Sequence, residues 1–179
     1  MKLSPCLAIL LITSSAFALE VESSAIKNGK LIAEEQVFDG FGCSGKNVSP
    51  DLTWSAGPKG TESYAVTMYD PDAPTGSGWW HWLVFNIPAD VTRLEKGFGS
   101  GHSKQNIPGV VQSKTDFGKP GYGGPCPPPG NKPHHYVFTV YALKTKTLQL
   151  DADSSGAMVG FQVRHNKLDE GKITAKYGR

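Results

Sequence analysis

The alternation of apolar and polar side chains predicts β-strands in several parts of the chain. In Ser63–Tyr69 the two faces of an extended segment carry different sets of side chains, as expected of a strand. His81–Ile87 and Tyr136–Leu143 are almost continuously apolar, which is typical of strands covered on both faces. Shorter runs at Leu19–Ser23 and Lys172–Tyr177 predict an early strand and an edge strand.

One segment near the end of the sequence has the features of a helix. Ser154–Leu168 begins with a pair of serines, which favour helix N-termini, and then brings several apolar side chains close together. Gly156 and Gly160 weaken this helix because glycine lowers helix propensity. The sequence predicts one helix here, with an imperfect 3.6-residue period.

The segment 96–133 has little periodicity and is rich in glycine and proline. A loop of this length inside a compact domain is either functional or disordered. Val110, Val111, Phe117 and Tyr122 are apolar anchors that a disordered linker lacks. We therefore expect an ordered surface loop, with disorder as the alternative.

The start of the chain has the composition of a secretory signal peptide. Lys2 precedes the apolar run Leu7–Ile12, and Ala16–Ala18 fits a small-x-small cleavage site. A retained anchor is the alternative, although the apolar run is too short to cross a membrane. We expect residues 1–18 to be a signal peptide and residues 19–179 to form one exported domain, periplasmic or secreted.

The rest of the sequence excludes several functional classes. The formal net charge is only +2, so a nucleic-acid partner is not expected. No later stretch is long and apolar enough for a transmembrane segment. Neither a GxSxG nucleophile elbow nor a Walker-type phosphate loop occurs, and no cofactor is expected.

Two cysteines, Cys43 and Cys126, remain once a leader containing Cys6 is removed. An even pair in an oxidising compartment predicts a disulfide between them. Two free thiols are the alternative interpretation. A metal site is less favoured, because the cysteines lie far apart in the sequence and no CxxC pair is present.

Acids and prolines alternate directly after the first long strand, in Asp70–Pro74. A structural turn is the simplest interpretation, because proline fixes φ and removes a donor. His81 begins the next strand, so this turn should bring the imidazole back beside Asp70 and Asp72. A carboxylate beside an imidazole orients its tautomer and favours its charged form.

Three tryptophans surround this histidine. Indole rings bury a large area and usually belong to the core. Strand alternation should place Trp82 in the core on the opposite face from His81. Trp79 or Trp80 should then lie at a rim or at a dimer surface.

Two adjacent histidines, His134 and His135, open the third long strand. Consecutive strand residues point to opposite faces, so only one of them can face a given pocket. A metal site with Asp70, Asp72 and His81 as further ligands is not expected, because no HExxH or HxH spacing is present.

Taken in order, these motifs resemble the phosphatidylethanolamine-binding protein family, also called the Raf kinase inhibitor-like family. The resemblance covers about residues 20–175, and the two-cysteine exported form is similar to the bacterial branch. The matching motifs are Asn47–Leu52 with Trp54, Asp70–Pro74 with His81 and Trp82, Asn86–Pro88, and the Gly/Pro-rich segment that ends in His134–Tyr136. The resemblance implies a mainly β fold of two packed antiparallel sheets with peripheral helices and a small anion pocket at strand ends.

The resemblance also implies which residues form this pocket. They are Asp70, Asp72, His81, His134 and Tyr136, with Gly124, Cys126 and Pro127 in a wall loop whose N–H groups face the ligand. Imidazoles, a phenol and main-chain donors suit a phosphate-like oxyanion. The carboxylates would hold the histidines protonated and oriented. The resemblance further suggests a cis peptide bond between Ala73 and Pro74.

The sequence therefore predicts an exported, non-catalytic module that binds a phosphate-like group: a phospholipid head group, a phosphorylated small molecule or a phosphoresidue. One alternative is a weak hydrolase that uses Asp70, His81 and His134 as acid/base groups. Another is a regulator or inhibitor of a protein partner that acts through the Gly/Pro loop. The sequence also leaves a homodimer open.

Overall fold

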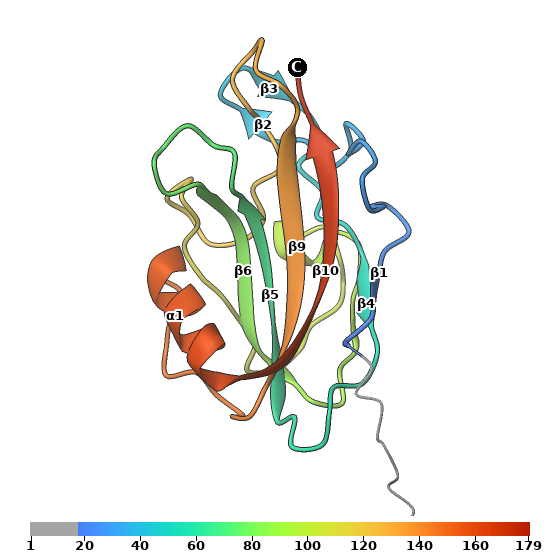
Figure 1. Cartoon of the computed structure of the whole chain (residues 1–179), viewed down its shortest axis with the longest axis vertical. Helices are drawn as coiled ribbons and strands as arrows, with labels where there is room; N and C mark the ends of the chain where they lie inside the picture. Colours follow the sequence, from blue (N-terminus) through green and yellow to red (C-terminus); the bar gives the residue numbers. More distant parts are fainter. Residues whose placement is uncertain (1–17) are drawn as a thin grey trace, which may run out of the picture.

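Five antiparallel strands form the main sheet of the described chain, residues 18–179 of a computed structural model (Figure 1). β5, β6 and β9 contain the three long predicted strands and lie inside this sheet, where both faces are covered. Across the sheet the order is β10 (Lys167–Tyr177), β9 (His134–Leu143), β5 (Ser63–Asp70), β6 (Trp79–Pro88) and β8 (Val111–Gln112).

A three-stranded antiparallel sheet packs on one face of the main sheet. It consists of β1 (Val21–Glu22), β4 (Leu52–Trp54) and β7 (Arg93–Leu94). The larger hydrophobic core fills the space between the two sheets, with Trp82 and Tyr136 among its fully buried side chains. The predicted fold class, mainly β with two packed antiparallel sheets, is confirmed.

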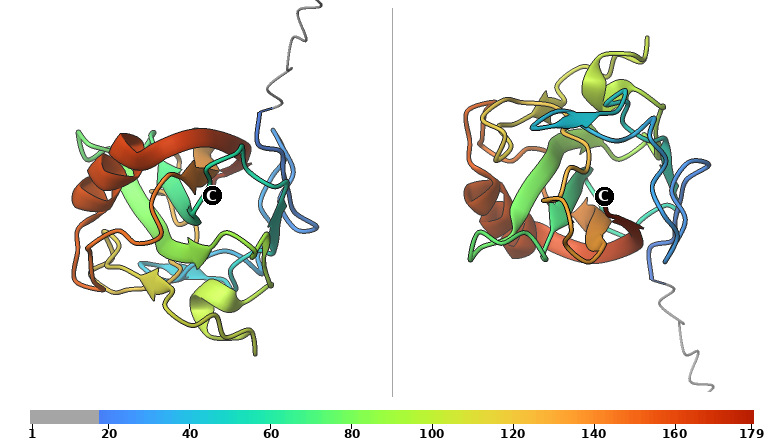
Figure 2. Two further views of the ribbon diagram at one scale, coloured as in Figure 1. Left: turned by 90° about the horizontal axis from the view of Figure 1, so that it is seen from below. Right: turned by 90° about the horizontal axis from the view of Figure 1, so that it is seen from above.

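The opposite face of the main sheet is covered by α1 (Gly156–Asn166), as the two end-on views show (Figure 2). The Ser155 hydroxyl caps this helix by accepting a hydrogen bond from the Met158 N–H. Gly156 and Gly160 lie against the Trp80 ring, and at Gly156 a side chain would clash with the indole. The glycines that weaken the helical pattern therefore allow the helix to approach the sheet.

The predicted helix is two residues too long at each end: Ser154 and Ser155 precede it, with Ser155 as its N-cap, and Lys167 and Leu168 already belong to β10. The early strand is shorter than predicted, and the edge strand is longer. Both differences concern segments whose extent depends on the strand that they pair with rather than on their own pattern.

The β2 (Asp39–Gly40) and β3 (Cys43–Ser44) hairpin lies at the end of the main sheet where β9 begins (Figure 1). A disulfide between Cys43 and Cys126 joins this hairpin to the Gly/Pro-rich segment. The predicted pairing is therefore present in the structure.

The Gly/Pro-rich segment 96–133 contains a short 3-10 helix, η1 (Phe98–Ser100), as well as β8. Its predicted anchors make contacts: Tyr122 is buried in the larger core, and Phe117 stacks on Phe38 and Phe41. The segment is therefore ordered, as expected, and it packs along the β6 edge of the main sheet and over the larger core.

No helix within residues 18–179 is long and apolar enough to cross a membrane. The predicted signal peptide, residues 1–18, lies almost wholly outside the described residues.

Candidate functional site

A cavity of about 200 Å³ lies where β5 ends and where β6 and β9 begin. Its polar side chains are Asp70, His81, His134 and Tyr136, all of which are buried. Its apolar walls come from the turn after β5, from the hairpin and from the Gly/Pro segment, and include Pro74, Trp79, Phe41, Phe117, Pro127 and Pro128. Four of the predicted pocket side chains therefore converge on one small cavity.

A β-bulge aims His81 into this cavity. Tyr69 pairs with Trp80 and Met68 with Trp82, so His81 is an extra residue with no partner on β5. His81 and Trp82 consequently lie on the same side of the sheet, where His81 contacts Tyr136 and Trp82 joins the same core. The prediction that Trp82 is core is correct, but the prediction that it faces away from His81 is wrong.

The His81 ring is held by the backbone of the Gly/Pro segment. Its Nδ1 lies 2.7 Å from the Gly123 carbonyl oxygen, and the Gly123 N–H donates to the His81 carbonyl at 2.8 Å. Burial lowers the pKa of His81 to about 4, and this effect outweighs the attraction of the Asp70 carboxylate. The expectation that carboxylates hold His81 protonated is therefore wrong, because the ring is neutral at pH 7.

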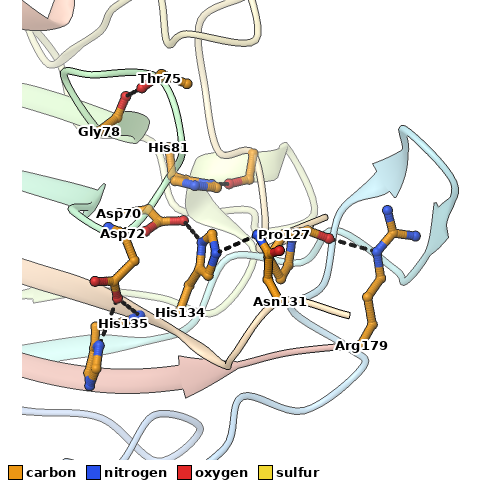
Figure 3. A network of polar contacts seen from close by, with 11 residues as sticks. Asp70, Asp72, Thr75, Gly78, His81, Pro127, Asn131, His134, His135 and Arg179 are labelled. Carbon is orange, nitrogen blue, oxygen red and sulfur yellow. Dashed lines mark hydrogen bonds and ion pairs between the residues drawn. The ribbon is translucent and has the colours of Figure 1, made fainter. Parts of the chain in front are cut away.

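A buried imidazole–carboxylate pair forms the opposite wall (Figure 3). His134 Nδ1 lies 2.8 Å from Asp70 Oδ2, and the other Asp70 oxygen accepts a hydrogen bond from the Asp72 N–H at 2.8 Å. Asn131 Nδ2 lies 3.4 Å from His134 Nε2. Both groups are thus oriented by contacts on more than one side.

Tyr136 provides a hydroxyl without a partner. Its side chain is buried in the core, and no group in residues 18–179 completes a hydrogen bond with its oxygen. Burial, followed by the charge of Asp70 and the approach of its carboxylate to the hydroxyl, raises the pKa of Tyr136, so the phenol stays protonated. The site therefore contains a buried O–H donor that is available to a ligand.

Two predicted pocket residues do not line the cavity. Asp72 is exposed and accepts a hydrogen bond from the His135 N–H, with its Oδ2 also 2.7 Å from His135 Nδ1 (Figure 3). Gly124 lies behind the wall, where its N–H donates to Asn47 Oδ1 at 2.8 Å. Strand alternation turns His135 away from His134, as predicted. Asp72 pairs with His135 and therefore lies outside the cavity.

The wall loop meets the cavity mainly through side chains. Cys126 and Pro127 line it, but prolines have no N–H and the Gly124 N–H is already engaged. Pro127 is held in turn by Arg179, whose Nε donates to the Pro127 carbonyl at 2.8 Å (Figure 3). An oxyanion would therefore find fewer main-chain donors here than the sequence suggested.

The peptide bond between Ala73 and Pro74 is trans, as are the other peptide bonds of the described residues. The Thr75 N–H donates to the Ala73 carbonyl at 2.8 Å, and Gly76 and Gly78 adopt positive φ values of 75° and 67°. These glycines supply the chain reversal for which the family resemblance suggested a cis proline. The prediction of a cis bond is wrong.

Three contributors to the site were not predicted. Phe41 has a left-handed φ of 53° and lies at the mouth, Asn131 contacts His134, and Asn47 holds the segment behind His81. The hairpin that carries Phe41 has no hydrophobic periodicity, so no sequence signal placed it beside the pocket.

Comparison with known proteins decides the family. The family model described as phosphatidylethanolamine-binding protein matches residues 22–178. The chain belongs to this family. It is 52% identical over 174 residues to UPF0098 protein YbcL of Escherichia coli strain K12, which covers 97% of this chain and 95% of that protein.

Members with solved structures share the fold. The crystal structure of E. coli YbcL superposes with a TM-score of 0.88 at 52% identity, covering 91% of this chain and 99% of that one.

A further relative is similar in sequence. The putative lipoprotein LppC of Mycobacterium tuberculosis strain H37Rv is 40% identical over 137 residues, covering 76% of this chain and 63% of that protein. Family membership supports a binding-type protein with the fold described above.

Proposed function

We propose that the protein is an exported, non-catalytic binding module whose pocket takes a phosphate-like group. The observation that carries this proposal is the unpartnered hydroxyl of Tyr136 in the cavity. Leaving a buried polar group without a hydrogen bond costs about 1–3 kcal/mol, which a ligand oxygen would recover.

The groups around this hydroxyl suit one end of a small ligand. The Tyr136 O–H donates, the His134–Asp70 pair is held in one orientation, and His81 presents its remaining ring nitrogen. The apolar walls exclude water from these polar groups and so strengthen their hydrogen bonds. A phosphate with a small organic substituent matches this division between a polar base and an apolar mouth.

Three features support export. Residues 1–18 have the composition of a signal peptide, and a disulfide such as that between Cys43 and Cys126 is typical of proteins in oxidising compartments. The relative LppC is named a putative lipoprotein, which is consistent with export. These features support the proposal that the protein is periplasmic or secreted.

The lining side chains favour binding over hydrolysis. Among the described lining residues, Cys126 is in a disulfide, and the Thr75 hydroxyl donates to the Gly78 carbonyl rather than to a general base. Asp70 and His134 are hydrogen-bonded to each other rather than to a nucleophile. We expect no release of phosphate from phenyl phosphate, and turnover would favour the weak-hydrolase alternative.

Replacing Tyr136 with phenylalanine is the direct test. We expect Tyr136→Phe to weaken the binding of phenyl phosphate about ten- to a hundredfold, because one hydrogen bond to a charged group is lost. The unliganded variant should be at least as stable as the wild type, since an unsatisfied hydroxyl is removed. Calorimetry at pH 6 and urea unfolding measure the two effects.

A second tyrosine of β9 provides the matched control. Tyr141 lies on the other face of the sheet, beside α1, so Tyr141→Phe removes the same atom away from the cavity. Its affinity should equal that of the wild type. An unchanged affinity in Tyr136→Phe, or an equal loss in both variants, would place the anion elsewhere.

A further inference from the structure

We propose that Asn47 is a positioning residue that makes His81 a hydrogen-bond acceptor toward the pocket, so that the site selects phosphate monoesters, which bring a proton, over phosphodiesters and sulfate esters, which do not. This inference rests on the proposed function. It names the class of anion that the site prefers.

Asn47 fixes the backbone on both sides of Gly123. Its Nδ2 donates to the Tyr122 carbonyl at 3.1 Å, and its Oδ1 accepts from the Gly124 N–H at 2.8 Å. Asn47 itself has a left-handed φ of 50°, a conformation that asparagine adopts more readily than most residues. One side chain thus holds the two peptide groups that flank Gly123.

Gly123 in turn determines which nitrogen of His81 carries the proton. A carbonyl oxygen can only accept, so the 2.7 Å contact requires a proton on His81 Nδ1. The return bond from the Gly123 N–H to the His81 carbonyl keeps the two residues in register. A side chain at Gly123 would clash with Phe117, so this close approach depends on glycine.

The other ring nitrogen of His81, Nε2, therefore carries a lone pair and can accept a hydrogen bond. Nε2 makes no hydrogen bond within the described chain, and His81 lines the cavity. The titratable groups that face the ring are Asp70 from β5 and His134 and Tyr136 from β9. Because burial lowers the pKa of His81 to about 4, the ring remains neutral and Nε2 remains an acceptor at pH 7.

An anion without a proton meets this lone pair and the Asp70 carboxylate. Such an anion can bind well only if His81 becomes protonated. Protonation is unfavourable at pH 7, because this pH lies about three units above the pKa of the ring. A phosphate monoester has a second pKa near ~6, so its singly protonated form is about one unit away. The difference of about two pH units between these two protonation steps predicts roughly hundredfold selectivity for the monoester at pH 7.

The selectivity should change with pH in a defined way. Below about pH 6 the monoester is already singly protonated, whereas His81 still gains protons down to about pH 4. The preference should therefore fall to about tenfold at pH 5. Above pH 6 both ligands lose affinity together, so the ratio should stay constant.

Calorimetry of the wild-type protein tests this with three probes: phenyl phosphate, phenyl sulfate and methyl phenyl phosphate. We expect phenyl phosphate to bind roughly a hundredfold more tightly than the other two at pH 7 and about tenfold more tightly at pH 5. Equal affinities at pH 7 would overturn the inference and leave the proposed function intact. Absence of binding by all three probes would overturn both.

Two substitutions test the role of Asn47. Asn47→Gly accepts the left-handed backbone but removes both side-chain hydrogen bonds, whereas Asn47→Asp can accept from Gly124 but cannot donate to Tyr122. We expect selectivity at pH 7 to fall below about tenfold in Asn47→Gly and to be intermediate in Asn47→Asp. Equal weakening of all probes, with selectivity retained, would mean a merely structural role and would overturn the inference.

Nitrogen NMR of the His81 ring provides a readout that does not depend on ligand. The wild-type ring should show a single neutral tautomer with its proton on Nδ1, and Asn47→Gly should show a mixture. This measurement on the wild type remains decisive even if the variants do not fold. A proton on Nε2 in the wild type would overturn the inference.

Discussion

Replacing Cys43 and Cys126 together by serine is expected to lower the free energy of unfolding by at most about 4 to 5 kcal/mol. The disulfide closes a loop with a sequence separation of 83, and the chain-entropy model gives an upper figure of this size for such a loop. A loss of this order would remove a large part of the stability of an ordinary domain. The variant should therefore unfold at a much lower urea concentration than the oxidised wild type.

Reductant provides the control for this prediction. Adding dithiothreitol to the wild type should reproduce the urea midpoint of the double-serine variant, while the variant itself should not respond. Identical midpoints for the oxidised wild type and the variant would contradict the stabilising role of the disulfide.

The hairpin should remain attached in the reduced protein. Arg179 bridges the two segments that the disulfide joins: its Nε donates to the Pro127 carbonyl and its Nη1 to the Gly42 carbonyl at 2.7 Å. These hydrogen bonds are independent of the sulfur atoms. The main effect of reduction should thus fall on global stability rather than on the shape of the pocket wall.

The strands of the main sheet could be predicted because their signal is local. Ser63–Asp70 and His134–Leu143 carry the period and the apolar content of covered strands, and both form close to the predicted bounds. Strand alternation also separated His134 from His135 correctly, since β9 pairs with β5 and β10 without an irregularity near its start.

The same rule failed on β6, where the pairing is interrupted. The bulge at His81 adds a residue opposite β5, and nothing in the sequence near Trp80 or Trp82 reveals it. Alternation assumes regular pairing, so it assigned His81 and Trp82 to opposite faces. The bulge is what allows a pocket residue and a core residue to be neighbours in the chain.

The protonation state of the site could not be predicted either. From the sequence, His81 appears as an imidazole beside two acids, which would raise its pKa. In the structure Asp72 turns outward to His135, and burial dominates the remaining influence of Asp70. Burial of a side chain depends on contacts such as those with Gly123 and Phe117, which are distant in sequence from β6.

Acidification is expected to destabilise the protein through His81. Its pKa is about 4 in the folded protein and about 6.5 in the unfolded chain, so the unfolded state binds more protons between these values. The contribution of His81 to stability is complete above pH 6.5 and is lost as the pH falls toward 4. The loss should be about 2 kcal/mol by pH 5 and about 3 kcal/mol by pH 4.

Urea unfolding at pH 7 and pH 5, in a buffer without phosphate or sulfate, measures this effect. The variant His81→Asn can still donate to the Gly123 carbonyl but cannot titrate, so its stability should fall about 2 kcal/mol less than that of the wild type. His165→Asn, at an exposed position of α1, should behave like the wild type. The comparison is made within each protein across pH, because the smaller asparagine also leaves space at pH 7. A fall in His81→Asn as large as in the wild type would show that His81 does not determine the acid sensitivity.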